Sequence, residues 1–246
     1  MRISALISIT ILFVLLITAC DEELFTSSKS IAGSGELIKI EKDIRGVSRF
    51  EFSQALDVEI VSGNNEYAAV TIDENLMEYL IFKQNGSTLT IGLENNNSYS
   101  DYEFNAEIVV PGIRKIEAAG AVSTAIYNFS SDENFEANFS GASELEGELT
   151  ASNVILILTG ASTVNLSGSC KNLNIDASGA SEIDLEQFES GNVDINLTGA
   201  SAALIFSNGT IKANLSGASI LSYMGDAEIT SITSSGLSIV RHLSGL

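Results

Sequence analysis

A glycine recurs at nearly constant spacing along the second half of the chain, and this repeat constrains the fold more than any other feature. The successive intervals are 21, 19, 19, 20, 18 and 19 residues, between Gly120, Gly141, Gly160, Gly179, Gly199, Gly217 and Gly236. A hydroxyl residue precedes six of the seven glycines, and Ala-Ser follows five of them. A fixed period of this length indicates a stacked repeat architecture, in which each unit contacts only its neighbours.

Apolar and polar residues alternate before each glycine. In the copy that ends at Gly179, the alternation runs through residues 173–177, and a shorter one follows at 183–185. Alternation with a period of two predicts strands with one buried and one solvated face. A polar segment such as 189–192 then leads to the next copy and predicts a turn.

Two strands, a corner and a turn in about 19 residues are too short for a βαβ unit or a propeller blade. We therefore predict an all-β fold, a right-handed parallel β-helix with coils of about 19 residues. Coils stack at roughly 4.8 Å, so equivalent residues should form columns. A sharp corner explains the glycine column, because it needs either a positive φ or room for the neighbouring backbone. The hydroxyls beside it are expected to satisfy turn amides, and not to act as nucleophiles.

The N-terminal residues indicate export and lipid attachment. Arg2 precedes an apolar run, residues 3–17, that is too short for a comfortable membrane span and leads into Ala19-Cys20. This pattern resembles the bacterial lipobox, whose cysteine is lipidated and becomes the mature N-terminus. We expect Cys20 to carry the acyl chains that hold the protein on a membrane. An ordinary secretory signal and an uncleaved anchor are the alternatives.

The chain divides into four segments by composition. We expect a signal peptide at 1–19, a flexible tether at 20–35, an irregular strand-rich part at 36–112 and regular β-helix coils at 113–246. The irregular part has strand patterns at 58–60, 70–72 and 108–110, and Asn85-Gly86 is a hairpin signal. It could form degenerate coils of the same helix or a small antiparallel cap.

The charge balance restricts the partners. The chain has 12 Lys and Arg against 32 Asp and Glu, a net charge of −20. Nucleic acid and anionic polysaccharides are poor partners for such a surface. The expected partners are the membrane, reached through Cys20, and a glycan or protein ligand at the cell surface.

Few residues offer nucleophilic or metal chemistry. Beside Cys20 the only thiol is Cys170, which we expect to be a small apolar filler within a turn at 167–170. His242 is the only histidine, and we expect it to cap the last coil. A zinc site based on histidine and cysteine lacks ligands. We therefore assign no catalytic, cofactor-binding or metal-binding residue.

Carboxylates are the one plentiful reactive type. Glu144 and Glu182 should share a column, as should Glu146 and Asp184, each pair two coils or roughly 9–10 Å apart. That spacing lies at the long end of the separation in inverting glycosidases. However, we expect no neighbouring aromatic residue to hold a sugar ring, and the chain has no Trp. A solvated outer face explains these carboxylates at least as well as an active site does. The column of Asn138, Asp176, Asn196 and Asn214 should also point outward as a polar strand face, with contact to sugar or calcium as the alternative.

Three segments of the irregular part precede the serial Ser-Gly-Ala-Ser corners. They are Gly46–Phe50, Asp57–Ile60 and Gly86–Ile91. Together with the corners they resemble the head GIN domain family, labelled an autotransporter adhesin family of unknown function, with many lipoproteins from Bacteroidota. The resemblance covers about residues 40–246 and implies a β-helix-like fold outside the cytoplasm. It implies no catalytic residue.

Two functional hypotheses follow. The first is a non-enzymatic, lipid-anchored module of the cell envelope, adhesin-like, that acts in binding or as a structural element. We expect it at the outer membrane, on the surface or the periplasmic face. The acidic residues 21–23 resemble a surface-export signal of Bacteroidota lipoproteins, and the family resemblance favours that signal. Residue 21 also fits an inner-membrane retention signal. The alternative function is a carbohydrate-active enzyme that acts on neutral glycan through the acidic columns.

Overall fold

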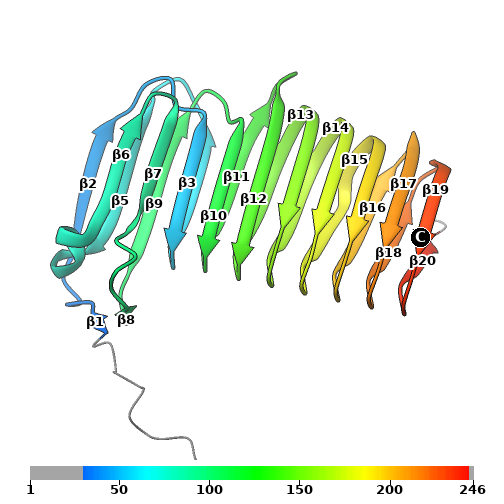
Figure 1. The fold of residues 1–246 in the computed structure, drawn as a ribbon. Helices are drawn as coiled ribbons and strands as arrows, with labels where there is room; N and C mark the ends of the chain where they lie inside the picture. Colours follow the sequence, from blue (N-terminus) through cyan, green and yellow to red (C-terminus); the bar gives the residue numbers. More distant parts are fainter. Residues whose placement is uncertain (1–29, 244–246) are drawn as a thin grey trace, which may run out of the picture.

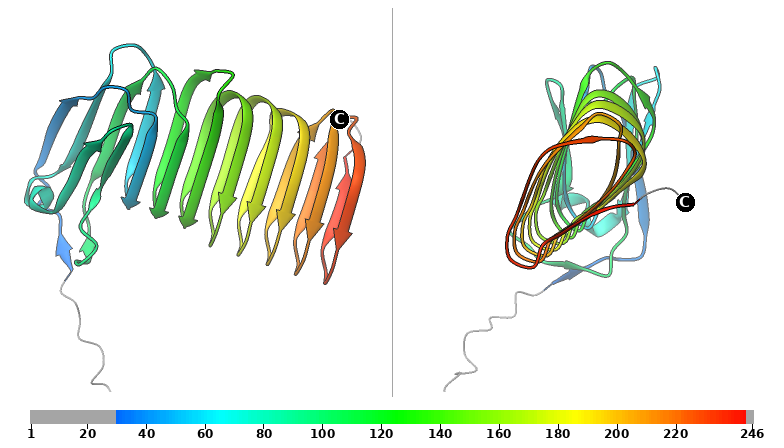
Figure 2. Two further views of the ribbon diagram at one scale, coloured as in Figure 1. Left: turned by 45° about the horizontal axis from the view of Figure 1, so that its top comes forward. Right: turned by 90° about the vertical axis from the view of Figure 1, so that its right-hand side faces the viewer.

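The computed structural model describes residues 30–243, which form one elongated stack of flattened coils (Figures 1 and 2). From β10 onward, each strand pairs in parallel with the equivalent strand of the preceding coil. The predicted parallel β-helix is confirmed. Its strands are β10 (Lys115–Gly120), β11 (Ser123–Ser130), β12 (Asn134–Gly141), β13 (Glu144–Leu158), β14 (Thr163–Ala177), β15 (Glu182–Leu197), β16 (Ala202–Ser207), β17 (Thr210–Leu215), β18 (Ile220–Met224), β19 (Glu228–Ser234) and β20 (Ile239–His242).

Each coil has two long faces that meet at the glycine corner. We call them the pre-glycine face, which carries β10, β12, β17 and β19, and the post-glycine face, which carries β11, β16, β18 and β20. The long strands β13, β14 and β15 contribute to both. They pass without interruption through the segments where the sequence predicts polar turns, including 189–192 and 167–170. The backbone there keeps its parallel register with the neighbouring coil.

The glycine column has both of the causes that the sequence predicts. All seven glycines have positive φ angles, between 72° and 111°. From Gly141 onward, an added Cβ would also overlap the carbonyl oxygen of the glycine one coil earlier. Only glycine combines this conformation with such a close backbone approach.

Serines two positions after the glycines close the corner. Ser143, Ser181 and Ser219 are buried, and each Oγ donates to the carbonyl of the residue three positions earlier, at 2.8–3.0 Å. Each hydroxyl thus satisfies the carbonyl of the residue before the glycine. Ser143 Oγ also accepts from the Val122 amide at 3.4 Å, the kind of partner that the sequence predicts. Their role in the corner is structural.

The irregular part contributes a coil that is out of chain order. β3 (Arg49–Gln54) pairs with β10, and β4 (Asp57–Ser62) pairs with β11, residue for residue and in parallel. On its other side this coil meets β7 (Thr88–Leu93) and β9 (Phe104–Val110), again in parallel. In Figure 1 the blue β3 accordingly lies between green strands.

An antiparallel cap closes this end of the stack. β2 (Leu37–Asp43) pairs with β5 (Tyr67–Asp73), β5 with β9, and β6 (Leu80–Asn85) with β7. The β6–β7 hairpin turns at the predicted Asn85-Gly86. A short 3-10 helix, η1 (Glu74–Tyr79), joins β5 to β6. The irregular part therefore contains both a degenerate coil and an antiparallel cap, the two arrangements that the sequence left open.

The last residues of the predicted tether are held against the cap. β1 (Ile31–Ala32) pairs with β8 (Tyr99–Ser100). The Gly35 amide donates to Asp73 Oδ1 at 2.6 Å, and the Ser34 amide donates to Asn75 Oδ1 at 2.9 Å. The predicted signal peptide and Cys20 lie outside the described residues. Within residues 30–243 there is no helix of the length and apolar character needed to cross a membrane.

Candidate binding site

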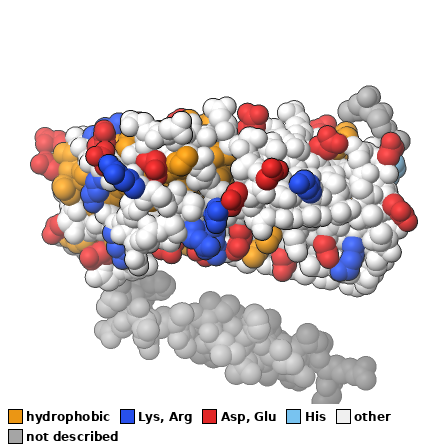
Figure 3. All heavy atoms as spheres, turned by 90° about the horizontal axis from the view of Figure 1, so that it is seen from above, with side chains coloured by type: hydrophobic (Ala, Val, Ile, Leu, Met, Phe, Trp, Pro, Cys, Tyr) orange, Lys and Arg blue, Asp and Glu red, His pale blue; other side chains and the backbone are white. Residues whose placement is uncertain are grey.

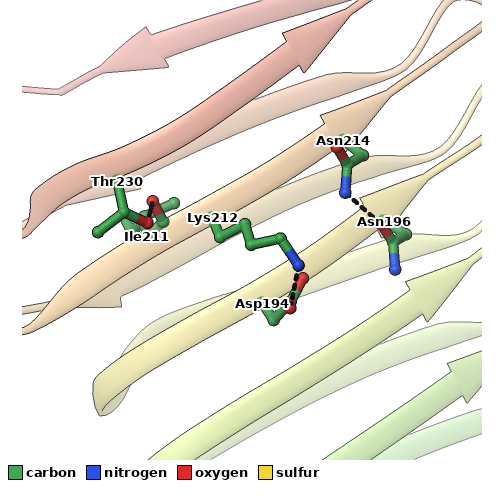
Figure 4. Close-up of polar contacts among 6 residues, drawn as sticks. All are labelled: Asp194, Asn196, Ile211, Lys212, Asn214 and Thr230. Carbon is green, nitrogen blue, oxygen red and sulfur yellow. Dashed lines mark hydrogen bonds and ion pairs between the residues drawn. The ribbon is translucent and has the colours of Figure 1, made fainter.

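Outward side chains of the pre-glycine face bind one another between coils. Lys212 Nζ lies 2.8 Å from Asp194 Oδ2, and Asn214 Nδ2 donates to Asn196 Oδ1 at 2.9 Å (Figure 4). The predicted column of Asn138, Asp176, Asn196 and Asn214 lies on this face, and the half-exposed Ile157 stands within it. These contacts link successive coils on this face.

An asparagine ladder, which sequence reasoning missed, runs beside the pre-glycine face. Asn153, Asn172 and Asn192 each donate from Nδ2 to Oδ1 of the equivalent asparagine one coil earlier, at 2.6, 2.7 and 3.1 Å. Thr210 ends the ladder by donating to Asn192 Oδ1 at 2.9 Å. The signal in the sequence is an asparagine seven positions before each of four successive glycines, starting with Asn134.

The predicted acidic columns lie on the post-glycine face. Thr163 stands in register between Glu144 and Glu182, and Asn165 stands between Glu146 and Asp184. Each carboxylate pair is therefore two coils apart, as predicted. An uncharged polar residue stands between the two carboxylates of each pair.

A depression of about 400 Å³ opens on this face between β11 and β15. We call it the Tyr127 depression. It brings together one predicted acidic pair and residues that no sequence argument singled out. Its lining comprises Tyr127, Glu146, Gly147, Asn165, Ser167, Asp184, Glu186 and Gln187.

Two β-bulges border the depression. In β11, Ile126 pairs with Gly147 and Phe129 pairs with Leu149, so two residues oppose one in the next coil. In β15, residues 185–187 likewise oppose two residues of β14. The floor between the bulges is formed by Gly147 and Ser167, which have small side chains or none. The depression is thus a property of the backbone, since bulges displace a strand locally and redirect its side chains.

The bulge in β11 presents an aromatic ring to solvent. Tyr127 is 39% exposed and is the only exposed Tyr or Phe side chain within residues 30–243. Asn128, beside it, has a φ of 63°, which non-glycine residues rarely adopt. The expectation that no aromatic residue neighbours the acidic columns is therefore wrong, because the parallel register brings Tyr127 next to Glu146's coil.

Polar groups in the depression are free for a ligand. Among the described residues, the side chains of Glu146, Asn165 and Gln187 have no hydrogen-bond or ion-pair partner. Ser167 Oγ donates to the Gly147 carbonyl at 3.3 Å, and Asp184 Oδ1 accepts from the Glu186 amide at 3.1 Å. The depression therefore offers amide donors together with amide and carboxylate acceptors.

The potentially reactive side chains lie elsewhere. Cys170 is only 8% exposed, and burial raises the pKa of its thiol to about 12. The His242 ring stacks on Tyr223 in the last coils, with centroids 4.7 Å apart, and its Nε2 lies 3.1 Å from the Gly225 carbonyl oxygen. Within residues 30–243, no group of three or more His, Cys, Asp or Glu is placed to hold a metal ion.

A family model described as "Putative auto-transporter adhesin, head GIN domain" matches residues 48–227, well over half of the chain. The chain belongs to this family. The resemblance noted from the sequence is thereby confirmed. No match was found among curated proteins.

Solved structures share the fold. A putative adhesin from Bacteroides fragilis has a TM-score of 0.81 at 15% identity, covering 87% of this chain and 100% of that one. A putative lipid binding protein from Parabacteroides distasonis has a TM-score of 0.69 at 21% identity, with the same coverage. A putative adhesin from Parabacteroides merdae has a TM-score of 0.64 at 16% identity, covering 87% and 99%. At these identities the likeness shows the fold alone.

Proposed function

We propose that this protein is a non-enzymatic, adhesin-like binding module of the cell envelope, anchored through a lipidated Cys20. The observation that carries the proposal is the Tyr127 depression, where Glu146, Asn165 and Gln187 have no partner among the described residues. Membership of a family described as an adhesin family supports the same role.

The β-helix is a suitable scaffold for binding. Long parallel ladders join β13 to β14 and, on both sides of the bulge, β14 to β15, and hydrophobic residues fill the interior. Groups on such a scaffold are held in place before the ligand arrives, which lowers the entropic cost of binding.

The placement of the nucleophiles supports a non-enzymatic role. Corner hydroxyls such as that of Ser181 are buried and donate to backbone carbonyls. The Cys170 thiol is buried with a raised pKa, and His242 lies in the last coil. None of these groups lines the Tyr127 depression.

An anchor at Cys20 fits the direction of the stack. The described chain enters the fold at β1, beside the antiparallel cap, and the coils extend away from that end (Figure 1). A membrane attached at the cap end would therefore leave the post-glycine face accessible along the coils. This supports a position on the envelope, with the outer membrane as the proposed membrane.

Fractionation and cell adhesion test the proposal. Wild-type protein should sediment with membranes, and Cys20→Ala should move it to the soluble fraction. Cells carrying the wild-type protein should adhere to immobilised glycoproteins more strongly than cells lacking it. Membrane retention of Cys20→Ala would contradict the anchor, and equal adhesion of the two strains would contradict the binding role.

A further inference from the structure

We propose that the Tyr127 depression binds a neutral oligosaccharide whose chain lies along the stack, from Tyr127 to Gln187. This inference rests on the proposed binding function and names its ligand class. The walls are two bulged strands separated by three coil steps, roughly 14 Å at the usual strand spacing. A short oligosaccharide fits between them.

Tyr127 supplies the stacking surface. Sugar rings have an apolar face of C–H groups and a rim of hydroxyls, so a carbohydrate site needs an aromatic ring beside polar groups. The bulge at 127–128 places the exposed Tyr127 ring at the edge of the depression. Aromatic rings provide large contact areas for an apolar face while keeping a polar group at one end.

The polar lining matches hydroxyl groups. Each sugar hydroxyl is a donor and an acceptor, and it needs both kinds of partner. Asn165 and Gln187 provide amide donors and acceptors, while Glu146 and Asp184 provide acceptors. Binding would break few bonds within the protein, since only Asp184 of these four is already engaged.

Charge excludes anionic sugars. Three carboxylates and no Lys or Arg line the depression. Acidic side chains also run along the length of the molecule in the view of Figure 3. Anionic glycans would be repelled. A basic peptide would also match the carboxylates, and the oligolysine arm of the test below distinguishes it. The exposed Tyr127 ring beside the uncharged amides of Asn165 and Gln187 favours a neutral glycan.

Calorimetric titration of the full chain carrying Cys20→Ser tests the inference. The probes are maltooligosaccharides, cellooligosaccharides, mannooligosaccharides and chitooligosaccharides, with heparin oligosaccharide and an oligolysine peptide as comparison arms. At least one neutral probe should bind and heparin should not. Tyr127→Ala should weaken binding about tenfold, whereas Tyr127→Phe should retain it.

Matched variants assign the binding to the depression. Asp184→Asn and Gln187→Ala should each lower the affinity for the same probe several-fold, because each substitution alters a side chain that lines the depression. Asp176→Asn, an exposed carboxylate on the pre-glycine face, should leave binding unchanged. All these positions are exposed, so thermal unfolding should match that of the parent and separate lost binding from lost structure.

Several outcomes would overturn the inference. They are failure of every neutral probe, binding only of oligolysine or heparin, and neutral binding that Tyr127→Ala and Asp184→Asn leave unchanged. The adhesion assay distinguishes this failure from failure of the proposed function. Adhesion that survives enzymatic deglycosylation of the immobilised glycoproteins would show a binding module whose ligand is not a glycan.

Discussion

Gln54 lies in register with Gly120 at the corner of adjacent coils, although residues 55–119 separate them in the chain. Gln54 has a φ of 72°, the conformation that the glycines adopt in later coils. A Cβ on Gly120 would lie 3.1 Å from the Gln54 carbonyl oxygen. The corner column therefore extends into the irregular part and begins with a residue that is not glycine.

Gly179→Val should destabilise the fold by several kcal/mol. The substitution places a β-branched residue at a φ of 86° and drives its Cβ into the Gly160 carbonyl. Thermal or urea unfolding measures the loss. Gly112→Ala is the control, because its Cβ would meet no atom within 4 Å and should change stability little. Equal stability of Gly179→Val and the wild type would refute the corner assignment.

Thr124→Val should stabilise the protein by about 1 kcal/mol or more. Thr124 is fully buried, and its Oγ1 has no hydrogen-bond partner among the described residues. Leu145 stands at the same position one coil later, so an apolar side chain suits the site. Thermal or urea unfolding should show a higher midpoint for Thr124→Val than for the wild type. The half-buried Thr163→Val is the control, and a lower midpoint for Thr124→Val would show that the hydroxyl has a partner.

Asn172→Ala should cost about 1 kcal/mol, because it removes two links of the asparagine ladder. Asn174, on the same strand, is exposed and makes no side-chain hydrogen bond among the described residues. Asn174→Ala should therefore change stability by less than about 0.5 kcal/mol. Chemical denaturation measures the loss in free energy of unfolding for each variant relative to the wild type. Equal losses would mean that the ladder adds nothing beyond a surface asparagine.

The Cys170 thiol should react slowly with a thiol reagent at neutral pH and rapidly in denaturant. Its pKa in the fold is about 12 against an ordinary value of 9.0. The fold therefore favours the neutral thiol, and above pH 9 the unfolded chain loses this proton before the folded one does. The free energy of unfolding is unaffected below pH 9 and falls as the pH rises toward 12. The stability of wild type relative to Cys170→Ala should therefore fall across that range. Fast native labelling would contradict the burial.

The regular coils could be predicted from the sequence, because a repeated glycine and a strand period report directly on local backbone and burial. The position of the coil at 49–62 could not. Its place between residues 88–110 and 115–130 depends on pairings between segments far apart in the chain. The periodicity within a segment does not determine which distant segment it pairs with.

The acidic columns were predictable from the same repeat, whereas the Tyr127 depression was not. The intervals of 21 and 20 residues that contain Tyr127 and Gln187 were visible as departures from 19. However, only the register shows that the added residues form bulges on the same face, with Gly147 and Ser167 between them. A bulge changes where a side chain points without changing the residue type.

Product analysis during binding tests the central claim, that the post-glycine face binds its ligand without chemistry. The full chain is incubated for a long period with each neutral oligosaccharide, and new reducing ends and chain lengths are measured beside the binding titration. The account predicts intact oligosaccharide and binding that Tyr127→Ala weakens. New reducing ends that Glu146→Gln or Asp184→Asn abolish would contradict it and identify an enzyme.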